Sequence, residues 1–273
     1  MSNESTSDTS ANFVGNVPGF YDRCLVPNIF EDYAAEMANR VADLSPHRVL
    51  ELAAGTGVVT QQLASKLSEA CTIVATDLNE PMLDLARSRI EGAENVHFET
   101  ADAMALPFEE SSQEVVACQF GVMFFPDKTA SFREVHRVLS PGGHYVFNAW
   151  NSHAENTFAR LADETAAKLV PDNPPPFYKV PFHYHDPDLI RSEVEAAGFE
   201  EVTIERRDLE KTVSSLDALA EGLVYGNPVA EELLQRGRDP SEMKDHLREG
   251  MKTAFGENPS VMPLSAWFVT ARK

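Results

Sequence analysis

Between residues 49 and 150, short apolar runs alternate with helix-type repeats, and this alternation constrains the fold more than any other feature of the sequence. The runs have the length of strands, and the repeats place apolar residues on one side of a helix. Strands are expected at 49–53, 71–77, 96–100, 114–120 and 144–150, with helices at 58–67, about 80–90 and 129–139. Such alternation predicts an α/β fold, a parallel sheet with helices on both faces.

The rhythm changes after Trp150. Residues 171–188 are rich in proline and aromatic residues, too irregular for a sheet element and too aromatic for a plain linker. The other elements expected here are helices at 155–170, from Asp186 or Asp188 to about 198, at 215–225 and at 241–254, and strands at 201–207 and 264–270. The last strand is expected to run antiparallel at or near the sheet edge. Together these elements predict a doubly wound, seven-stranded, mostly parallel sheet with a helical or irregular lid.

The charge balance limits the partners. The chain has 43 acidic and 23 basic residues and a formal net charge of −20. A field of that sign repels nucleic-acid phosphates and anionic membrane surfaces, so neither is expected as a partner. Residues 1–10 lack the apolar core of a signal peptide, and no apolar run reaches membrane-spanning length. The cysteines lack metal-type spacing, so no metal site is expected. We expect a cytoplasmic protein with reduced thiols, present as a monomer or a homodimer.

A carboxylate and a glycine turn meet in the stretch VLELAAGTGVVT, residues 49–60. Ligands of open parallel sheets bind beyond the carboxyl ends of the strands, where this turn is expected. Gly55 and Gly57 carry no Cβ atom, so a ligand can approach the backbone closely. Glu51 lies inside the apolar strand, and burial of an unpaired charge is expensive, so its carboxylate needs a partner.

Two further acids follow strands. Asp77 comes about twenty residues after Gly57, where a carboxylate can accept hydrogen bonds from ribose hydroxyls; its alternative role is a helix N-cap. Asp102 follows the third strand, where it can accept from an adenine amine or serve as a turn residue. The nicotinamide fingerprint G-x-G-x-x-G lacks its third glycine here. S-adenosylmethionine, with an ammonium group, a sulfonium, a ribose and an adenine, satisfies all three acids.

Four stretches together resemble the class I S-adenosylmethionine-dependent methyltransferases, in particular the small-molecule group that includes ubiquinone/menaquinone biosynthesis methyltransferases. They are VLELAAGTG, IVATDLNEPMLDLA, ADAMALPFEESSQEVVACQFGVMFFPD and REVHRVLSPGGHYVFNAW. The resemblance is strong over residues 49–150 and loose afterwards. It implies a Rossmann-like fold in a single methyltransferase domain at 13–273. The polar composition of the N-terminus predicts a disordered tail at 1–12. Within this domain the cofactor-binding core would lie at about 45–150, and the lid and substrate-side elements at about 151–260 and 13–40.

The resemblance also implies roles for matching residues. Glu51 would orient the amino end of the cofactor's methionine, and Asp77 would bind the ribose diol. The backbone cradle would be lined by Ala53, Gly55 and Gly57. The adenine would be contacted by Leu78, Met82, Asp102 and Ala103.

The end of the fourth strand would lie near the reactive methyl group, which places Gln119 and Phe120 there. Many relatives with amine substrates have an acid or asparagine with an aromatic motif at this point. The stretch QFGVMFF departs from that pattern, so methylation at oxygen or carbon is favoured over methylation at nitrogen. Tyr21 resembles an aromatic residue of an N-terminal segment that closes over the cofactor; simple packing of a helix is its alternative.

A general base for the substrate is not identified by the sequence. His153, His183 and His185 are weak candidates, because histidine titrates near neutral pH. His183 and His185 would share a face if that piece is extended. Structural or solvent-facing histidines are the alternative for each.

Aromatic residues indicate a pocket for a small apolar or aromatic molecule. The candidates for its wall are Phe124, Phe125, Trp150, Phe158, Phe177, Tyr178, Phe182 and Tyr184. Residues 171–184, with Phe20 and Tyr21, are expected to cover the substrate side of the cofactor. Two other functions stay open, a nicotinamide-dependent oxidoreductase and a non-catalytic S-adenosylmethionine-binding module.

Overall fold

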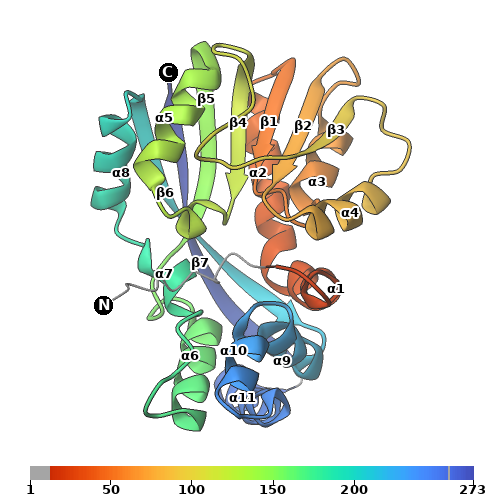
Figure 1. Ribbon diagram of the computed structural model, residues 1–273, viewed down its shortest axis with the longest axis vertical. Helices are drawn as coiled ribbons and strands as arrows, with labels where there is room; N and C mark the ends of the chain where they lie inside the picture. Colours follow the sequence, from red (N-terminus) through yellow and green to blue (C-terminus); the bar gives the residue numbers. More distant parts are fainter. Residues whose placement is uncertain (1–12, 258) are drawn as a thin grey trace, which may run out of the picture.

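Seven strands form one sheet in the computed structural model, which describes residues 13–257 and 259–273 (Figure 1). In sheet order they are β3 (Val96–Thr100), β2 (Thr72–Asp77), β1 (Arg48–Leu52), β4 (Gln113–Gln119), β5 (Leu139–Trp150), β7 (Ser260–Arg272) and β6 (Glu200–Val213). β7 pairs antiparallel with both of its neighbours, and every other pair is parallel. The predicted doubly wound, mostly parallel sheet is confirmed, with β7 one strand in from the edge. The tail predicted at 1–12 lies outside the described residues.

Helices cover both faces of the sheet, as the alternation predicts. On one face lie α2 (Glu31–Asp43), α3 (Val58–Lys66) and α4 (Glu80–Arg89), and on the other α5 (Lys128–Val138) and α8 (Pro187–Ala196). Side-chain caps fix where the last two begin: Asp127 accepts from Ala130 N, and Asp186 accepts from Asp188 N. These starts agree with the sequence analysis.

A cluster of helices lies below the sheet, at the ends of the long strands β6 and β7 (Figure 1). It contains α6 (Thr157–Leu169), α9 (Leu216–Tyr225), α10 (Val229–Gln235) and α11 (Pro240–Phe255). Neither the length of these strands nor helix α10 was expected from the sequence. The full length of β6 could not be predicted because this strand is largely exposed and lacks a run of buried residues.

β5 contains a bulge at residues 140–143, ahead of the position at which the fifth strand was expected to begin. Gln113 pairs with Leu139 and Val115 pairs with His144, so a single β4 residue faces four residues of β5. Gly142, at φ +80°, permits the detour. β5 therefore starts five residues earlier than predicted.

The N-terminal elements are α1 (Val17–Phe20) and the π-helix η1 (Tyr21–Phe30), and two short helices lie elsewhere, η2 (Val122–Phe124) and α7 (Lys179–His183). Helix α9 packs directly on η1. A Cβ atom at Gly222 would lie 2.7 Å from Cys24 Cβ, and one at Gly226 would lie 3.1 Å from Tyr21 N. Both glycines therefore let the two helices touch.

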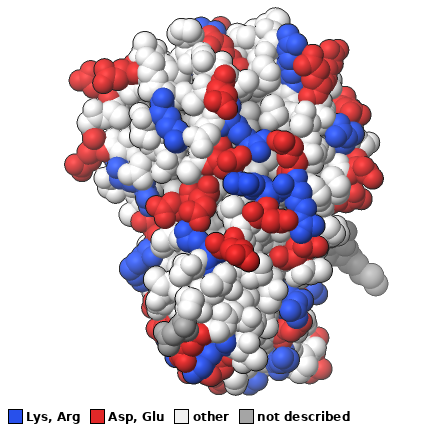
Figure 2. All heavy atoms as spheres, turned by 180° about the vertical axis from the view of Figure 1, so that it is seen from behind, with Lys and Arg blue, Asp and Glu red and all other residues white. Residues whose placement is uncertain are grey.

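Acidic and basic side chains are interleaved over the rear of the molecule (Figure 2). Two ion pairs there join α2 to β6: Arg40 Nη1 lies 2.5 Å from Glu205 Oε2, and Lys211 Nζ lies 2.8 Å from Asp32 Oδ2. Charged side chains on β6 also discourage edge-to-edge pairing with another sheet.

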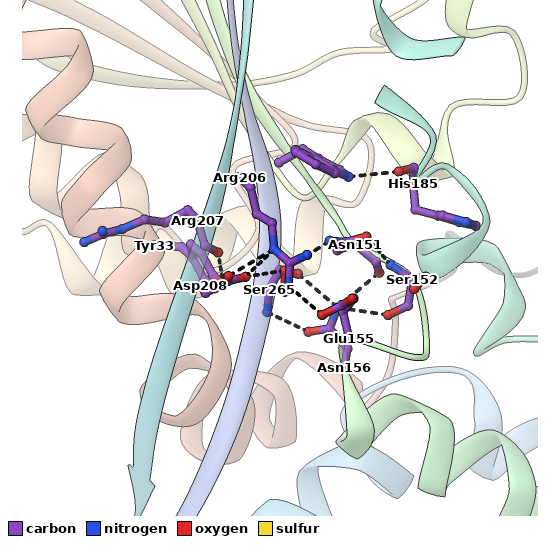
Figure 3. A network of polar contacts seen from close by, with 11 residues as sticks. Tyr33, Asn151, Ser152, Glu155, Asn156, His185, Arg206, Arg207, Asp208 and Ser265 are labelled. Atoms are coloured by element: carbon purple, nitrogen blue, oxygen red, sulfur yellow. Dashed lines mark hydrogen bonds and ion pairs between the residues drawn. The ribbon is translucent and has the colours of Figure 1, made fainter. Parts of the chain in front are cut away.

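A polar network fixes the cluster to the sheet where β5 ends (Figure 3). The Asn156 amide donates to Asn151 O and Ser265 O and accepts from Ser265 N, at 2.9–3.1 Å. Ser265 Oγ donates to Asp208 Oδ1 at 2.6 Å, and Arg206 pairs with Asp208. Asn156 is fully buried and starts α6, so it sets the direction of that helix.

Candidate active site

A cavity of about 290 Å³ opens at the carboxyl ends of the parallel strands. This is where an open α/β sheet binds its ligands. Of the predicted cofactor-binding residues, those that line the cavity are Tyr21, Ala53, Gly55, Asp77, Leu78, Met82, Asp102, Ala103, Gln119 and Phe120. The other two, Glu51 and Gly57, lie behind this lining.

The glycine turn has two different tasks. Gly55, at φ +57°, lines the cavity, and the nearest atom to a Cβ built there is Met82 Cε at 3.6 Å. Gly57, at φ +81°, faces α4, where its Cβ would lie 2.8 Å from Ala86 Cβ. Gly57 thus supplies close packing between helices, and its predicted place in the cradle is not seen in the cavity lining.

Asp77 ties the end of β2 to the glycine turn. One carboxylate oxygen accepts from Gly55 N at 2.9 Å, and the other accepts from Asn79 N at 2.8 Å. Burial raises the pKa of Asp77 above its usual value, against the lowering effect of these backbone donors. A carboxylate offers about four acceptor positions, so it can still receive ribose hydroxyls.

Glu51 is buried beneath the turn. Its Oε2 accepts from Thr60 Oγ1 at 2.7 Å, and Asp77 lies close enough to act on it electrostatically. Burial raises the pKa of Glu51 to about 8. The Glu51 carboxyl group therefore lies below the cavity, hydrogen-bonded to Thr60 and without an exposed face.

The ends of β1 and β4 are both in the left-handed backbone region, at Ala53 (φ +51°) and Phe120 (φ +50°). Non-glycine residues are uncommon there, and such strained positions are often found at functional sites. Asn148, fully buried on β5, accepts from Phe120 N at 2.8 Å and supports this conformation. Sequence reasoning missed Asn148; a polar residue within the apolar run of the fifth strand was the available signal.

The side of the cavity that was predicted to take the adenine is open. Asp102 is exposed and accepts from Met104 N at 2.9 Å, which is the turn role named as its alternative. Leu78 is 59% exposed although its side chain is apolar. An exposed apolar side chain at a cavity mouth fits the face of a flat ring.

Aromatic rings form the opposite half. The Phe120 and Trp150 rings are stacked at 3.9 Å and 9°, and Phe182 stacks on Trp150 at 5.8 Å. Of the predicted wall, the cavity is lined by Phe124, Phe125, Trp150, Phe158, Phe177, Tyr178 and Phe182. Tyr184 points elsewhere, and its hydroxyl donates to Glu193. Phe20 packs on Tyr225, outside the cavity lining.

None of the three candidate histidines lines the cavity. His153 Nε2 lies 2.9 Å from Tyr178 O, His185 Nδ1 lies 2.9 Å from Phe182 O, and His183 is exposed. The extended conformation considered for 183–185 is wrong, because residues up to His183 form α7. His153 and His185 thus contact backbone carbonyls of the lid. Within the described ranges, no group of three or more His, Cys, Asp or Glu side chains is placed to hold a metal ion.

The site's chemistry fits the predicted cofactor. Gly121 lets the two strand ends approach, since its Cβ would lie 2.6 Å from Ala53 Cβ. Thr56 Oγ1, in the glycine turn, is buried without a hydrogen-bond partner, and such groups normally have one. Carboxylates at Asp77 and Asp102 flank the apolar Leu78 and Met82. A cradle with this lining suits a nucleoside joined to a charged tail.

Fold and cavity define a Rossmann-like α/β protein that binds a nucleoside cofactor beside an aromatic pocket. A model of the ubiE/COQ5 methyltransferase family matches residues 24–172, just over half of the chain. The chain belongs to this family. The predicted class, a methyltransferase, is thereby confirmed, and S-adenosylmethionine is the cofactor of that class.

Two relatives illustrate the match. A demethylmenaquinone methyltransferase of Clavibacter sepedonicus is 30% identical over 186 residues, 64% of this chain and 74% of its own length. One from Lactococcus lactis subsp. lactis is 34% identical over 116 residues, 42% of this chain and 46% of its own length. In the second case the chain matches less than half of the relative.

Solved structures confirm the fold. Phosphoethanolamine N-methyltransferase 2 of Haemonchus contortus superposes with a TM-score of 0.63 at 17% identity. The superposition covers 97% of this chain and 59% of that protein. At this level of identity the similarity concerns the fold alone.

Proposed function

We propose that this protein transfers a methyl group from S-adenosylmethionine to a carbon or oxygen atom of a small apolar ring compound, a quinol or a related phenol. The aromatic cavity that continues from the cofactor turn carries this proposal. The names of the relatives, demethylmenaquinone methyltransferases, supply the substrate class. Their partial coverage makes the particular substrate a matter for experiment.

We assign the cofactor to the half of the cavity formed by β1, β2 and β3. Asp77 would accept from the ribose hydroxyls, Leu78 and Met82 would cover the adenine, and Asp102 and Ala103 would face its edge. When bound, the cofactor supplies a methyl group on a positively charged sulfur. The buried Glu51 would counter the charge of the cofactor's ammonium group through its position below the turn.

The substrate half aligns a ring and excludes water. Phe120, Trp150 and Phe182 form stacked surfaces on which a planar ring can lie. Holding the acceptor atom in line with the methyl group replaces a random encounter, and such positioning contributes several powers of ten in rate. The chain's part in the reaction is therefore mainly orientation.

The side chains that line the cavity do not supply an assigned general base for the substrate. The titratable side chains that line the cavity are Tyr21, Asp77, Asp102 and Tyr178. Tyr178 donates its hydroxyl proton to Leu223 O, and burial raises its pKa. We therefore expect an acceptor that is already electron-rich, such as a phenol that has given its proton to solvent or the ring carbon beside it. After transfer to carbon, the displaced ring proton also leaves to solvent.

The neutral Gln119 favours such an acceptor over an amine. Its amide lies 3.3 Å from Phe30 O and 3.5 Å from Asn148 Nδ2, both long contacts. An amine substrate carries a positive charge before transfer and calls for a carboxylate here. Gln119 offers no charge, in keeping with an uncharged ring.

The alternatives are less well supported. A nicotinamide enzyme is not the family matched by the chain. A module that only binds cofactor needs no cavity beyond it, yet the lining continues to Phe158 and Asn227. Among the helices of the described ranges, none has both the length and the apolar character to cross a bilayer. We propose a cytoplasmic monomer or homodimer without a nucleic-acid partner, and the mixed charges of the rear face agree with this (Figure 2).

Incubation with S-adenosylmethionine and a panel of 1,4-naphthoquinols, catechols and amines tests the proposal. Mass spectrometry should find one added methyl group on a quinol or phenol, only when the cofactor is present. The Asp77→Ala variant should form less of this product when the cofactor is limiting. Methylated amines without methylated phenols would contradict the assignment of the acceptor.

A further inference from the structure

One N-terminal segment, residues 13–30, covers both halves of the cavity; we refer to it as the cover segment. Phe13 contacts Tyr21 and Phe124 with ring centroids at 6.0 Å, and Phe177 of the lid at 6.5 Å. Tyr21 stacks on Phe30 at 5.0 Å and 22°. Tyr21 reaches the cofactor half, where Asp77 acts on it electrostatically, whereas Phe13 and Phe30 reach the aromatic half.

Arg89, at the end of α4, joins this segment to the glycine turn. Its Nε donates to Thr56 O at 2.9 Å, and its Nη2 forms an ion pair with Asp22. The Arg89 side chain is 21% exposed and that of Asp22 is 33% exposed. A partly buried guanidinium that uses two of its nitrogens on two partners is a directional contact, and charge-assisted hydrogen bonds are the stronger kind.

The two partners of Arg89 lie beside the residues that contact ligand. Thr56 lies between Gly55 and Gly57 in the turn, and Asp22 follows Tyr21. On its other side the cover segment rests on α9 through Gly222 and Gly226. Arg89 therefore links the turn to the residue beside Tyr21, and the ring contacts of Phe13 link Tyr21 to the lid.

We propose that Arg89 is a positioning residue that fastens the cover segment to the cofactor turn and thereby couples occupancy of the two halves of the cavity. This inference rests on the proposed function, because it assigns cofactor to one half and ring substrate to the other. Cofactor in the turn and a ring against Phe13 favour the same closed arrangement of the cover segment. Such coupling is reciprocal, so each ligand raises the affinity for the other by the same factor.

The fastening can be measured with S-adenosylhomocysteine and trypsin. In Arg89→Ala the affinity for S-adenosylhomocysteine should fall about tenfold by calorimetry, since a charge-assisted contact is lost. Trypsin should cut after Arg23, an exposed residue of the cover segment, several-fold faster than in wild type even without ligand. Arg87→Ala is the matched control, because Arg87 pairs with Glu80 and Asp84 on its own helix.

The coupling is measured with menadione as the ring probe. In wild type, saturating S-adenosylhomocysteine should tighten menadione binding at least fivefold, and Arg89→Ala should abolish this gain while Arg87→Ala keeps it. The exchange Asp22→Arg with Arg89→Asp should restore part of it. Equal cleavage rates and equal affinities in Arg89→Ala and Arg87→Ala would overturn the role of Arg89. Failure of wild type to bind S-adenosylhomocysteine would instead overturn the proposed function and the coupling, while the ligand-free cleavage rates still decide whether Arg89 holds the segment.

Discussion

The two halves of the cavity are built in different ways. The cofactor half comes from neighbouring strand ends and positions its groups largely through backbone, as where Asp77 binds the N–H groups of Gly55 and Asn79. The substrate half is assembled from rings of separate segments, among them Phe13, Trp150 and Phe177. The cofactor half, which is fixed by local backbone contacts, tolerates few substitutions. The substrate half is made of side chains, so substitutions there can alter its specificity.

Of the substitutions considered, removal of the Trp150 side chain should have the largest effect on stability and on the affinity for ring substrates. This residue is 3% exposed and stacks on Phe120 and Phe182. Trp150→Ala should lower the free energy of unfolding by about 3–5 kcal/mol in urea denaturation, the usual cost of a large core deletion. It should also weaken ring substrates more than S-adenosylhomocysteine.

Trp267→Ala is the control for this variant. That indole donates to His185 O, is only half-buried and is not among the residues that line the cavity. A smaller loss of stability with unchanged substrate preference is expected. An equal loss of substrate affinity in both variants would show that the aromatic half is not a separate binding surface.

The pH dependence of stability sharpens the account of the cofactor half. Burial raises the pKa of Glu51 to about 8 from a model-peptide value of 4.5. Between these values the folded protein holds one more proton than the unfolded chain, so the free energy of unfolding falls as pH rises. The decline should amount to a few kcal/mol across this window, and Glu51→Gln should flatten it.

The affinity for cofactor should change in the opposite sense. Only the ionised Glu51 attracts an ammonium group, so S-adenosylmethionine should bind more tightly as pH approaches and passes about 8. Calorimetry across this range is the measurement. A flat stability profile in wild type would contradict a protonated Glu51 in the free protein.

Asp77→Ala should weaken S-adenosylmethionine by on the order of 2 kcal/mol, about thirtyfold, because a charged acceptor of two hydroxyls is lost. The exposed Asp84, on the neighbouring helix, gives the control Asp84→Ala. Asp77→Asn keeps the size of the side chain and should fall between wild type and alanine. Unchanged affinity in Asp77→Ala would remove this residue from the cofactor site.

Phe177→Ala should have the smallest effect, about a fivefold rise in KM for a ring substrate with the affinity for cofactor unchanged. Phe177 is the suitable lid residue, since Tyr178 also bonds Leu223 O and Asn227 and its loss would disturb α9. Wild-type kinetics in this variant would reduce the lid at residues 171–184 to scaffolding.

The sequence predicted the cofactor half because its signals are local. Glu51, the glycines and Asp77 lie within one strand–turn–helix–strand unit. The spacing of apolar residues and the glycines that end the strand are recognisable in the sequence. The separate task of Gly57 was missed, since the approach of Ala86 depends on how two helices pack. Asn148 was missed for the same reason: its partner, Phe120 N, lies 28 residues away.

The substrate half was predicted in composition and not in arrangement. Seven of the eight proposed wall residues line the cavity. Tyr184 and the three histidines do not line it. The hydroxyl of Tyr184 donates to Glu193, His153 and His185 contact backbone carbonyls, and His183 ends α7 and is exposed. Helix α10 and the long β6 were hidden by exposed, polar patterns that carry little periodic signal.

The long strands β6 and β7 have a consequence for how such proteins diversify. Val213 pairs with Ser260, so residues 214–259, with α9, α10 and α11, leave the sheet and return to it at adjacent positions. An insertion whose two ends are adjacent can lengthen, shorten or be replaced during evolution without shifting the register of any strand. New substrate ranges can therefore arise through recombination of this one insertion, while the inherited cofactor machinery is passed on intact.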